Sequence, residues 1–171
     1  MNSDALEAPA PMSGWKRFWL SAVMVPLALF EIWDSSMFFL ALDLSEIGSG
    51  FSGVLTKIYI FTHPVFTVAA FLCALAGRVR WAVIAMAGVV LGRWLWYLPG
   101  PNGSLASKEL YVLAQPTIML VIIPPVLAVC ALMLARASRR LGLATLFVCA
   151  PVIYSNYEMA LFILAVSIYG F

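Results

Sequence analysis

Hydrophobic residues fill five long stretches of this chain, and short polar segments separate them. The stretches cover residues 18–42, 55–76, 81–98, 110–135 and 142–169. A transmembrane α-helix needs about 20 mostly apolar residues to cross a hydrocarbon core about 30 Å thick. The pattern therefore predicts an all-α integral membrane protein, a bundle of five transmembrane helices whose main partner is the lipid bilayer.

The composition supports this prediction. Of the 171 residues, 64% are hydrophobic and 11% are charged, whereas a soluble domain is roughly half apolar and about a quarter charged. We expect a short polar N-terminal tail at residues 1–14 and a single five-helix domain over residues 15–171. The tail contains no basic residue, which is unlike the start of a cleaved signal peptide, so we expect the first helix to remain in the mature protein.

Basic residues gather before the first helix and in alternate connections between helices. They are Lys16 and Arg17, then Arg78 and Arg80, then Arg136, Arg139 and Arg140. Because Lys and Arg accumulate in cytoplasmic segments, the N-terminus is predicted inside and the C-terminus outside. The compact multi-pass architecture suggests a bacterial inner (plasma) membrane. The net charge of +2, without a dense basic run, gives no support for a nucleic-acid partner.

Aromatic residues agree with this orientation, since amphipathic rings favour the two membrane interfaces. Trp15, Trp19 and Trp81 are predicted at the inner interface. The aromatic residues predicted at the outer interface are Tyr59, Trp94, Trp96, Tyr97, Tyr111 and Tyr169.

Proline and glycine predict kinked and closely packed helices. Proline falls inside four of the five predicted helices, where it removes a backbone donor and favours a kink. These prolines are Pro26, Pro64, Pro116, Pro124, Pro125 and Pro151. The third helix instead carries Gly88 and Gly92 at GxxxG spacing, which favours close approach of a neighbouring helix.

Residues 56–64 and 107–116 resemble each other. Each segment has a hydroxyl residue, a lysine and a tyrosine, followed by His63 or Gln115 and then a proline. One interpretation is a duplicated helical hairpin, in which the second and third helices correspond to the fourth and fifth. It predicts that superposed hairpins place His63 and Gln115 at the same depth.

Seven polar residues inside the predicted helices are candidate ligand-binding or proton-binding groups. They are Glu31, Asp34, His63, Arg93, Gln115, Asn156 and Glu158. With a rise of about 1.5 Å per residue, most of them lie roughly 7 to 12 Å below the outer ends of their helices, and the two glutamates somewhat deeper. All five helices thus contribute to a polar layer in the outer half of the membrane.

The chemistry of these residues predicts a charge-compensated cluster. Glu31 and Asp34 are three residues apart and share one helix face. Arg93 is the expected counter-ion, since its planar guanidinium can hold a carboxylate with two hydrogen bonds. His63, the single histidine of the chain, could carry a proton or hydrogen bond to a ligand. The cluster could instead only hold the helices in register, but a membrane charge costs about 2.5 to 3.5 kcal/mol, which favours a functional role.

Two function classes remain open from the sequence. The first is a polar pocket that binds a small polar, quinone-like or lipid-like molecule, or that relays protons. The alternative is a non-catalytic accessory or assembly subunit of a larger membrane complex, or a homo-oligomer. The sequence has no HExxH motif and no glycine-rich phosphate loop, so enzyme activity is not favoured and no catalytic residue or cofactor is indicated. One histidine beside scattered carboxylates makes a poor metal site.

Overall fold

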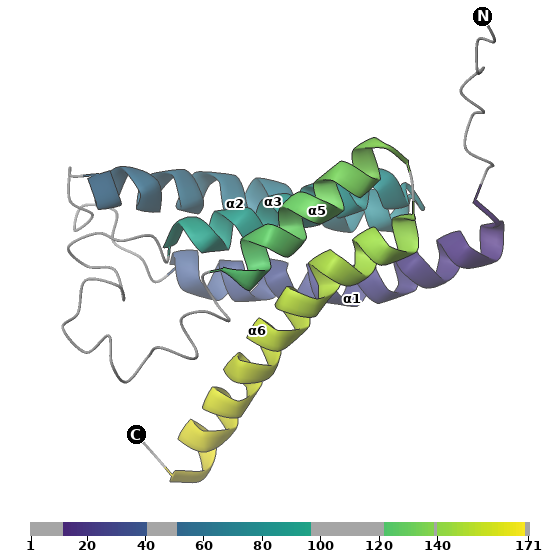
Figure 1. Ribbon diagram of the computed structural model, residues 1–171. Coiled ribbons are helices and arrows are strands. Elements are labelled where there is room, and N and C mark those ends of the chain that lie inside the picture. The colour runs from purple at the N-terminus through teal and green to yellow at the C-terminus, as the bar shows by residue number, and fades with distance from the viewer. Residues whose placement is uncertain (1–11, 41–50, 97–121, 139, 170–171) are drawn as a thin grey trace, which may run out of the picture.

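The computed structural model describes residues 12–40, 51–96, 122–138 and 140–169. Within these residues every regular element is an α-helix, which confirms the all-α prediction for this part of the chain. The helices are α1 (Gly14–Leu40), α2 (Phe51–Leu75), α3 (Val79–Trp96), α5 (Ile123–Arg136) and α6 (Leu141–Tyr169). Figure 1 shows them gathered into one bundle.

Two of the described helices are long enough and apolar enough to cross a membrane. The segments are Gly14–Ser36 in α1 and Gly53–Leu75 in α2. Shorter apolar segments are Ile123–Arg136 and Leu141–Tyr157. Many large apolar side chains point outward from these helices, among them Phe61 and Val65 of α2. This surface suits a lipid environment better than water, since extended apolar patches are rare on soluble monomers.

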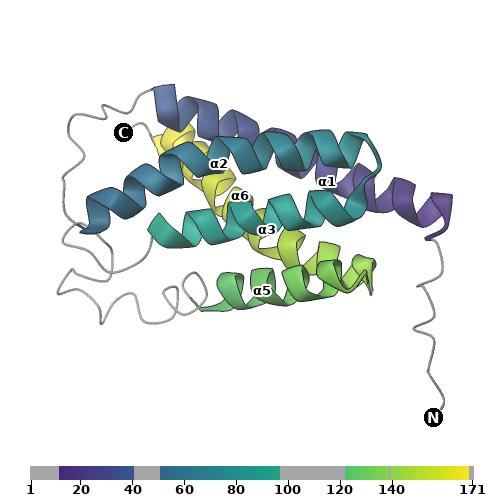
Figure 2. The same cartoon turned by 90° about the horizontal axis from the view of Figure 1, so that it is seen from above.

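The helices α1, α2 and α3 lie side by side, and α5 packs on α3 (Figures 1 and 2). Helix α6 crosses the bundle and contacts α5, α3 and α1. Its C-terminal half leaves the other described helices at a steep angle (Figure 1). The start of α1 lies against the α2–α3 turn, and Arg80 after that turn bonds to the end of α5. These segments share one end of the bundle, so the polar candidates near the other ends of α1 and α3 become neighbours.

Small residues make this close packing possible. The alanines without any solvent exposure are Ala28, Ala70, Ala82, Ala87, Ala128, Ala131, Ala135 and Ala144. Larger side chains at the centre include Met24, Met86 and Val83. Membrane helices commonly pack through small residues, because dispersion contacts between backbones replace the hydrophobic driving force.

Gly88 provides a test of this packing. A Cβ atom at Gly88 would lie 2.7 Å from the ring of Phe66 on α2, whereas a Cβ at Gly142 meets nothing within 4 Å. We expect Gly88→Val to lower the free energy of unfolding in detergent by about 1 to 3 kcal/mol through overpacking. Gly142→Val is the matched control and should change it far less; equal effects would show that α2 and α3 do not meet at Gly88.

Helices α1 and α2 begin about one turn before their predicted starts. Helix α1 begins at Gly14, one turn before residue 18, because Ser13 caps it: its hydroxyl accepts a hydrogen bond from the Lys16 backbone N–H at 3.4 Å. Helix α2 begins at Phe51 rather than at residue 55. Of the predicted helix at 110–135, residues 110–121 lie outside the described part.

Pro124 and Pro125 do not kink a helix, contrary to the prediction. They lie in the first turn of α5, which begins at Ile123. Proline is well tolerated there, since the first N–H groups of a helix have no partner within it. Pro26, Pro64 and Pro151 do lie inside helices, as predicted. The segment 107–116 of the proposed duplication, with Gln115 and Pro116, lies outside the described residues.

Candidate functional site

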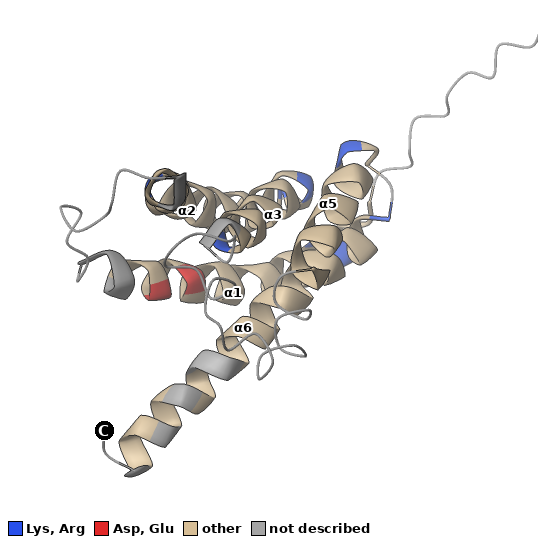
Figure 3. Cartoon of the chain, turned by 60° about the vertical axis from the view of Figure 1, so that its left-hand side comes forward, with Lys and Arg blue, Asp and Glu red and all other residues tan. Residues whose placement is uncertain are grey.

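The fold brings five of the seven predicted polar residues together. Glu31 and Asp34 come from α1, His63 from α2, Arg93 from α3 and Asn156 from α6. Gln115 and the side chain of Glu158 lie outside what the structure describes. Figure 3 marks the acidic positions of α1 in red and the basic positions in blue. We call the five residues, together with Ser35, Tyr59 and Ser155 that join them, the polar cluster.

Arg93 is the centre of the polar cluster. Its Nη2 donates to Glu31 Oε2 at 2.9 Å and to Asp34 Oδ2 at 3.0 Å. Its Nη1 donates to the hydroxyl of Ser155 on α6. Arg93 lies in the last turn of α3, where the helix dipole also favours a cation. One guanidinium therefore connects α1, α3 and α6, as the charge-compensation argument predicts.

The two carboxylates have different surroundings. The side chain of Glu31 has no solvent exposure, whereas that of Asp34 is 24% exposed. With its amide nitrogen facing the carboxylate, Asn156 donates to Glu31 Oε1 at 3.2 Å and to the Val152 carbonyl at 3.3 Å. Glu31 Oε2 also lies 3.4 Å from His63 Nε2. Glu31 is thus the fully enclosed acid of the site, and Asp34 is the more accessible one.

His63 is held from both sides of its ring. Its Nδ1 lies 2.8 Å from the hydroxyl of Ser35, and that hydroxyl also contacts the Glu31 backbone carbonyl. The ring of Tyr59 is 4.9 Å from the His63 ring, centroid to centroid. The side chain of His63 is completely buried. Its position between α1 and α2 is therefore fixed by contacts with both helices.

Three members of the polar cluster were not predicted. Tyr59 was predicted only as an outer-interface residue, and the structure adds that it is buried beside His63. Ser35 could have been found, since it follows Glu31 by one helical turn and shares its face. The contact of Ser155 with Arg93 could not be predicted, because a serine in a membrane helix usually bonds to its own backbone.

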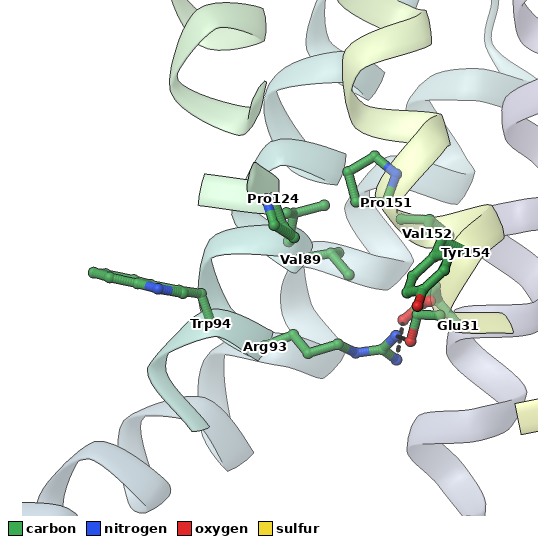
Figure 4. A pocket seen from close by; sticks show the side chains of 10 residues that line it. Glu31, Val89, Arg93, Trp94, Pro124, Pro151, Val152 and Tyr154 are labelled. Atoms are coloured by element: carbon green, nitrogen blue, oxygen red, sulfur yellow. Dashed lines mark hydrogen bonds and ion pairs between the residues drawn. The ribbon is translucent and has the colours of Figure 1, made fainter. Parts of the chain in front are cut away.

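A groove adjoins the polar cluster on the side of α5 and α6 (Figure 4). Its apolar walls include Val89, Val90, Pro124, Pro151 and Val152, and it ends at Glu31, Arg93 and Ser155. It encloses about 460 Å³, including space open to the surroundings. A second hollow of about 440 Å³ shares Pro124, Pro151 and Tyr154 with it and is otherwise lined by Ile123, Leu127 and Ala150. Both hollows are mainly apolar, and the first has a polar end at Glu31, Arg93 and Ser155.

The polar end carries a defined formal charge. Glu31, Asp34 and Arg93 sum to −1 when the His63 ring is neutral, and to zero when one further proton is bound. The groups that line the groove's polar end include two donors, the guanidinium of Arg93 and the hydroxyl of Ser155. This arrangement suits hydrogen bonding to a neutral acceptor, since a third anion beside Glu31 and Asp34 would add to the excess negative charge.

No family model, curated protein or solved structure matches this chain. Its function must therefore be argued from the geometry of the polar cluster and the groove.

Proposed function

We propose that this chain is a multi-pass protein of the bacterial inner membrane that binds a neutral, quinone-like molecule in the groove. In this proposal the chain crosses the bilayer five times, with the N-terminus in the cytoplasm and the C-terminus outside. The ligand's carbonyl head meets Arg93 and Ser155, and its apolar body lies between α5 and α6. The single observation that carries the proposal is the apolar groove that ends at a buried, charge-compensated cluster.

The grouping of basic segments supports this orientation. Arg80 Nη2 donates to the Arg136 backbone carbonyl at 3.2 Å, which joins the α2–α3 turn to the end of α5. The side chain of Arg17 lies against Gly77 of the same turn. Three basic segments far apart in sequence therefore share one end of the bundle, as the positive-inside rule requires of a cytoplasmic face. Trp15, Trp19 and Trp81 are exposed near these segments.

The charge of the polar cluster determines which kind of ligand head group it can bind. A carboxylate or phosphate head would place a third anion beside Glu31 and Asp34, whose charges already exceed that of Arg93. A quinone carbonyl is neutral and only accepts hydrogen bonds, which matches the donors Arg93 and Ser155. The apolar walls contribute binding free energy in proportion to the ligand surface that they cover, about 25 cal/mol per Å².

A pair of neighbouring substitutions tests binding in the groove. Val152 is buried and lines the groove, whereas Ile153 is half-exposed on another face of α6. We expect Val152→Phe to fill the groove and to raise the dissociation constant of a short-chain benzoquinone at least about tenfold, equivalent to 1.4 kcal/mol. Ile153→Phe should leave it unchanged. Quenching of tryptophan fluorescence can follow binding, because Trp94 lines the groove.

A lysophospholipid in the same assay distinguishes the two kinds of ligand. Binding of the benzoquinone alone supports the proposal. Binding of the lysophospholipid alone, with the same dependence on Val152, would replace the quinone-like ligand by a lipid-like one. Equal quenching in wild type, Val152→Phe and Ile153→Phe would show only partition into the detergent and would contradict groove binding.

One feature of α6 supports the alternative function, an accessory subunit of a larger complex. Beyond the polar cluster, its side chains Tyr157, Leu161, Leu164 and Ile168 are exposed and apolar. Lipid would cover this face in a monomer, and a partner helix would cover it in a complex. Co-purification with a larger complex in mild detergent, lost in Leu161→Ala/Leu164→Ala, is the result that the accessory role requires.

A further inference from the structure

The contact between Glu31 and His63 is not needed for binding in the groove. The groove meets Glu31 from the side of α3 and α6, whereas His63 approaches the carboxylate from α2. Both side chains are completely buried. A buried carboxylate beside a buried imidazole is costly unless protons and charges are matched, so the number of protons that the pair holds can be worked out from its contacts.

Ser35 determines the proton on one side of the ring. Its hydroxyl has a single hydrogen and lies within hydrogen-bond distance of both the Glu31 backbone carbonyl and His63 Nδ1. The carbonyl can only accept a hydrogen bond, so the hydroxyl donates to it. The contact between Ser35 Oγ and Nδ1 then needs a hydrogen from the ring. His63 therefore carries a proton on Nδ1.

The other ring nitrogen now faces an acceptor. Nε2 lies 3.4 Å from Glu31 Oε2. In a neutral ring protonated on Nδ1, Nε2 has a lone pair, and an ionised Glu31 would oppose it with another. A single proton between the two atoms removes this repulsion, whether it belongs formally to the imidazole or to the carboxyl group.

The charges around the pair also indicate one shared proton. The charged or titratable groups that face it are Asp34 on its own helix α1, Tyr59 on α2 and Arg93 on α3. From α6 come the neutral Ser155 and Asn156, and the phenol of Tyr154 lies beside Glu31 and Arg93 (Figure 4). With Tyr59 neutral, the cluster has a formal charge of −1 when the pair holds no shared proton. Uptake of one proton from water brings the charge to zero.

We propose that Glu31 and His63 form a proton-binding site, which holds one exchangeable proton between Glu31 Oε2 and His63 Nε2. Ser35 is a positioning residue that keeps the Nδ1 side occupied. The site lies between α1 and α2 and takes up or releases its proton without any ligand in the groove. It would allow the protein to couple ligand binding or helix movement to the proton concentration on the side of the membrane from which protons reach the site.

The single histidine makes this site directly observable. Histidine labelled with ¹⁵N in the full-length protein, in lipid nanodiscs, gives ring signals from His63 alone. Over roughly pH 5 to 9, the range around the ordinary titration of imidazole, Nδ1 should remain protonated. Nε2 should share a proton at the acidic end of this range. A bare Nδ1 with a protonated Nε2, or an Nε2 that stays bare throughout, would overturn the proposal.

Variants separate the roles of the two contacts. Glu31→Gln should abolish the shared proton and leave Nε2 bare; signals equal to wild type would contradict the proposal. Should that variant fail to fold, Ser35→Ala is the second test, and it should shift the neutral ring toward the tautomer protonated on Nε2. Ser36→Ala is its matched control, since Ser36 bonds only to the Trp33 carbonyl at 2.8 Å among the described contacts. An unchanged tautomer in Ser35→Ala would contradict the assigned role of Ser35.

Discussion

Arg93→Leu is expected to lower the free energy of unfolding by about 3 to 5 kcal/mol, as removal of one partner from a buried ion pair does. The substitution removes the guanidinium that pairs with both Glu31 and Asp34 and changes the formal charge of the three positions from −1 to −2. It also leaves Ser155 without its link to α1. Titration of the purified protein with a denaturing detergent measures the change.

Two further variants show whether the lost charge pairing causes the loss of stability in Arg93→Leu. Arg78→Leu removes an exposed arginine at the opposite end of the bundle and should cost no more than about 0.5 kcal/mol, like other surface substitutions. In Arg93→Leu/Glu31→Gln/Asp34→Asn all three charges are gone, and most of the lost stability should return. A single Arg93→Leu variant as stable as wild type would show that the ion pairs do not hold the helices together.

Val65→Asp is expected to prevent stable membrane insertion of α2. Val65 lies near the middle of the segment Gly53–Leu75, and its side chain is 66% exposed. If that face contacts lipid, a carboxylate there costs about 2.5 to 3.5 kcal/mol. The fraction of protein that remains in membranes after alkaline extraction should therefore fall sharply.

Val54→Asp is the matched control for this prediction. Val54 is also exposed but lies at the start of the same segment, where the cost of a charge falls toward the interface and the side chain can reach water. Its effect on membrane integration should be small. Equal and full integration of wild type, Val54→Asp and Val65→Asp would argue against a lipid-facing α2.

Much of the polar cluster was accessible from the sequence, because charged residues in apolar helices need partners. The common depth of Asp34, His63 and Arg93 predicted a shared layer, and helix periodicity placed Glu31 on the same face as Asp34. The need for charge balance then indicated Arg93 as the counter-ion. These arguments depend only on spacing along helices and on the cost of charge in a low dielectric medium.

The remaining features depend on how the helices approach one another. Tyr59 looked like an interface residue, but its burial follows from the close packing of α2 on α3, where its ring lies 3.8 Å from the position of a Cβ on Gly92. The role of Ser155 depends on the crossing of α6 over α3. Pro124 and Pro125 start a helix rather than bend one, and hydrophobicity alone does not locate that start, because it continues on both sides.

In the proposed binding mode, the apolar groove places the neutral head of the ligand at the polar cluster. An experimental structure in lipid nanodiscs tests it most directly, through the density between α5 and α6. We expect an elongated density whose polar end lies within hydrogen-bond distance of Arg93 and Ser155 and whose body follows Pro124, Pro151 and Val152. A groove closed by the protein's own side chains, with Glu31 and Arg93 sealed from it, would contradict the account.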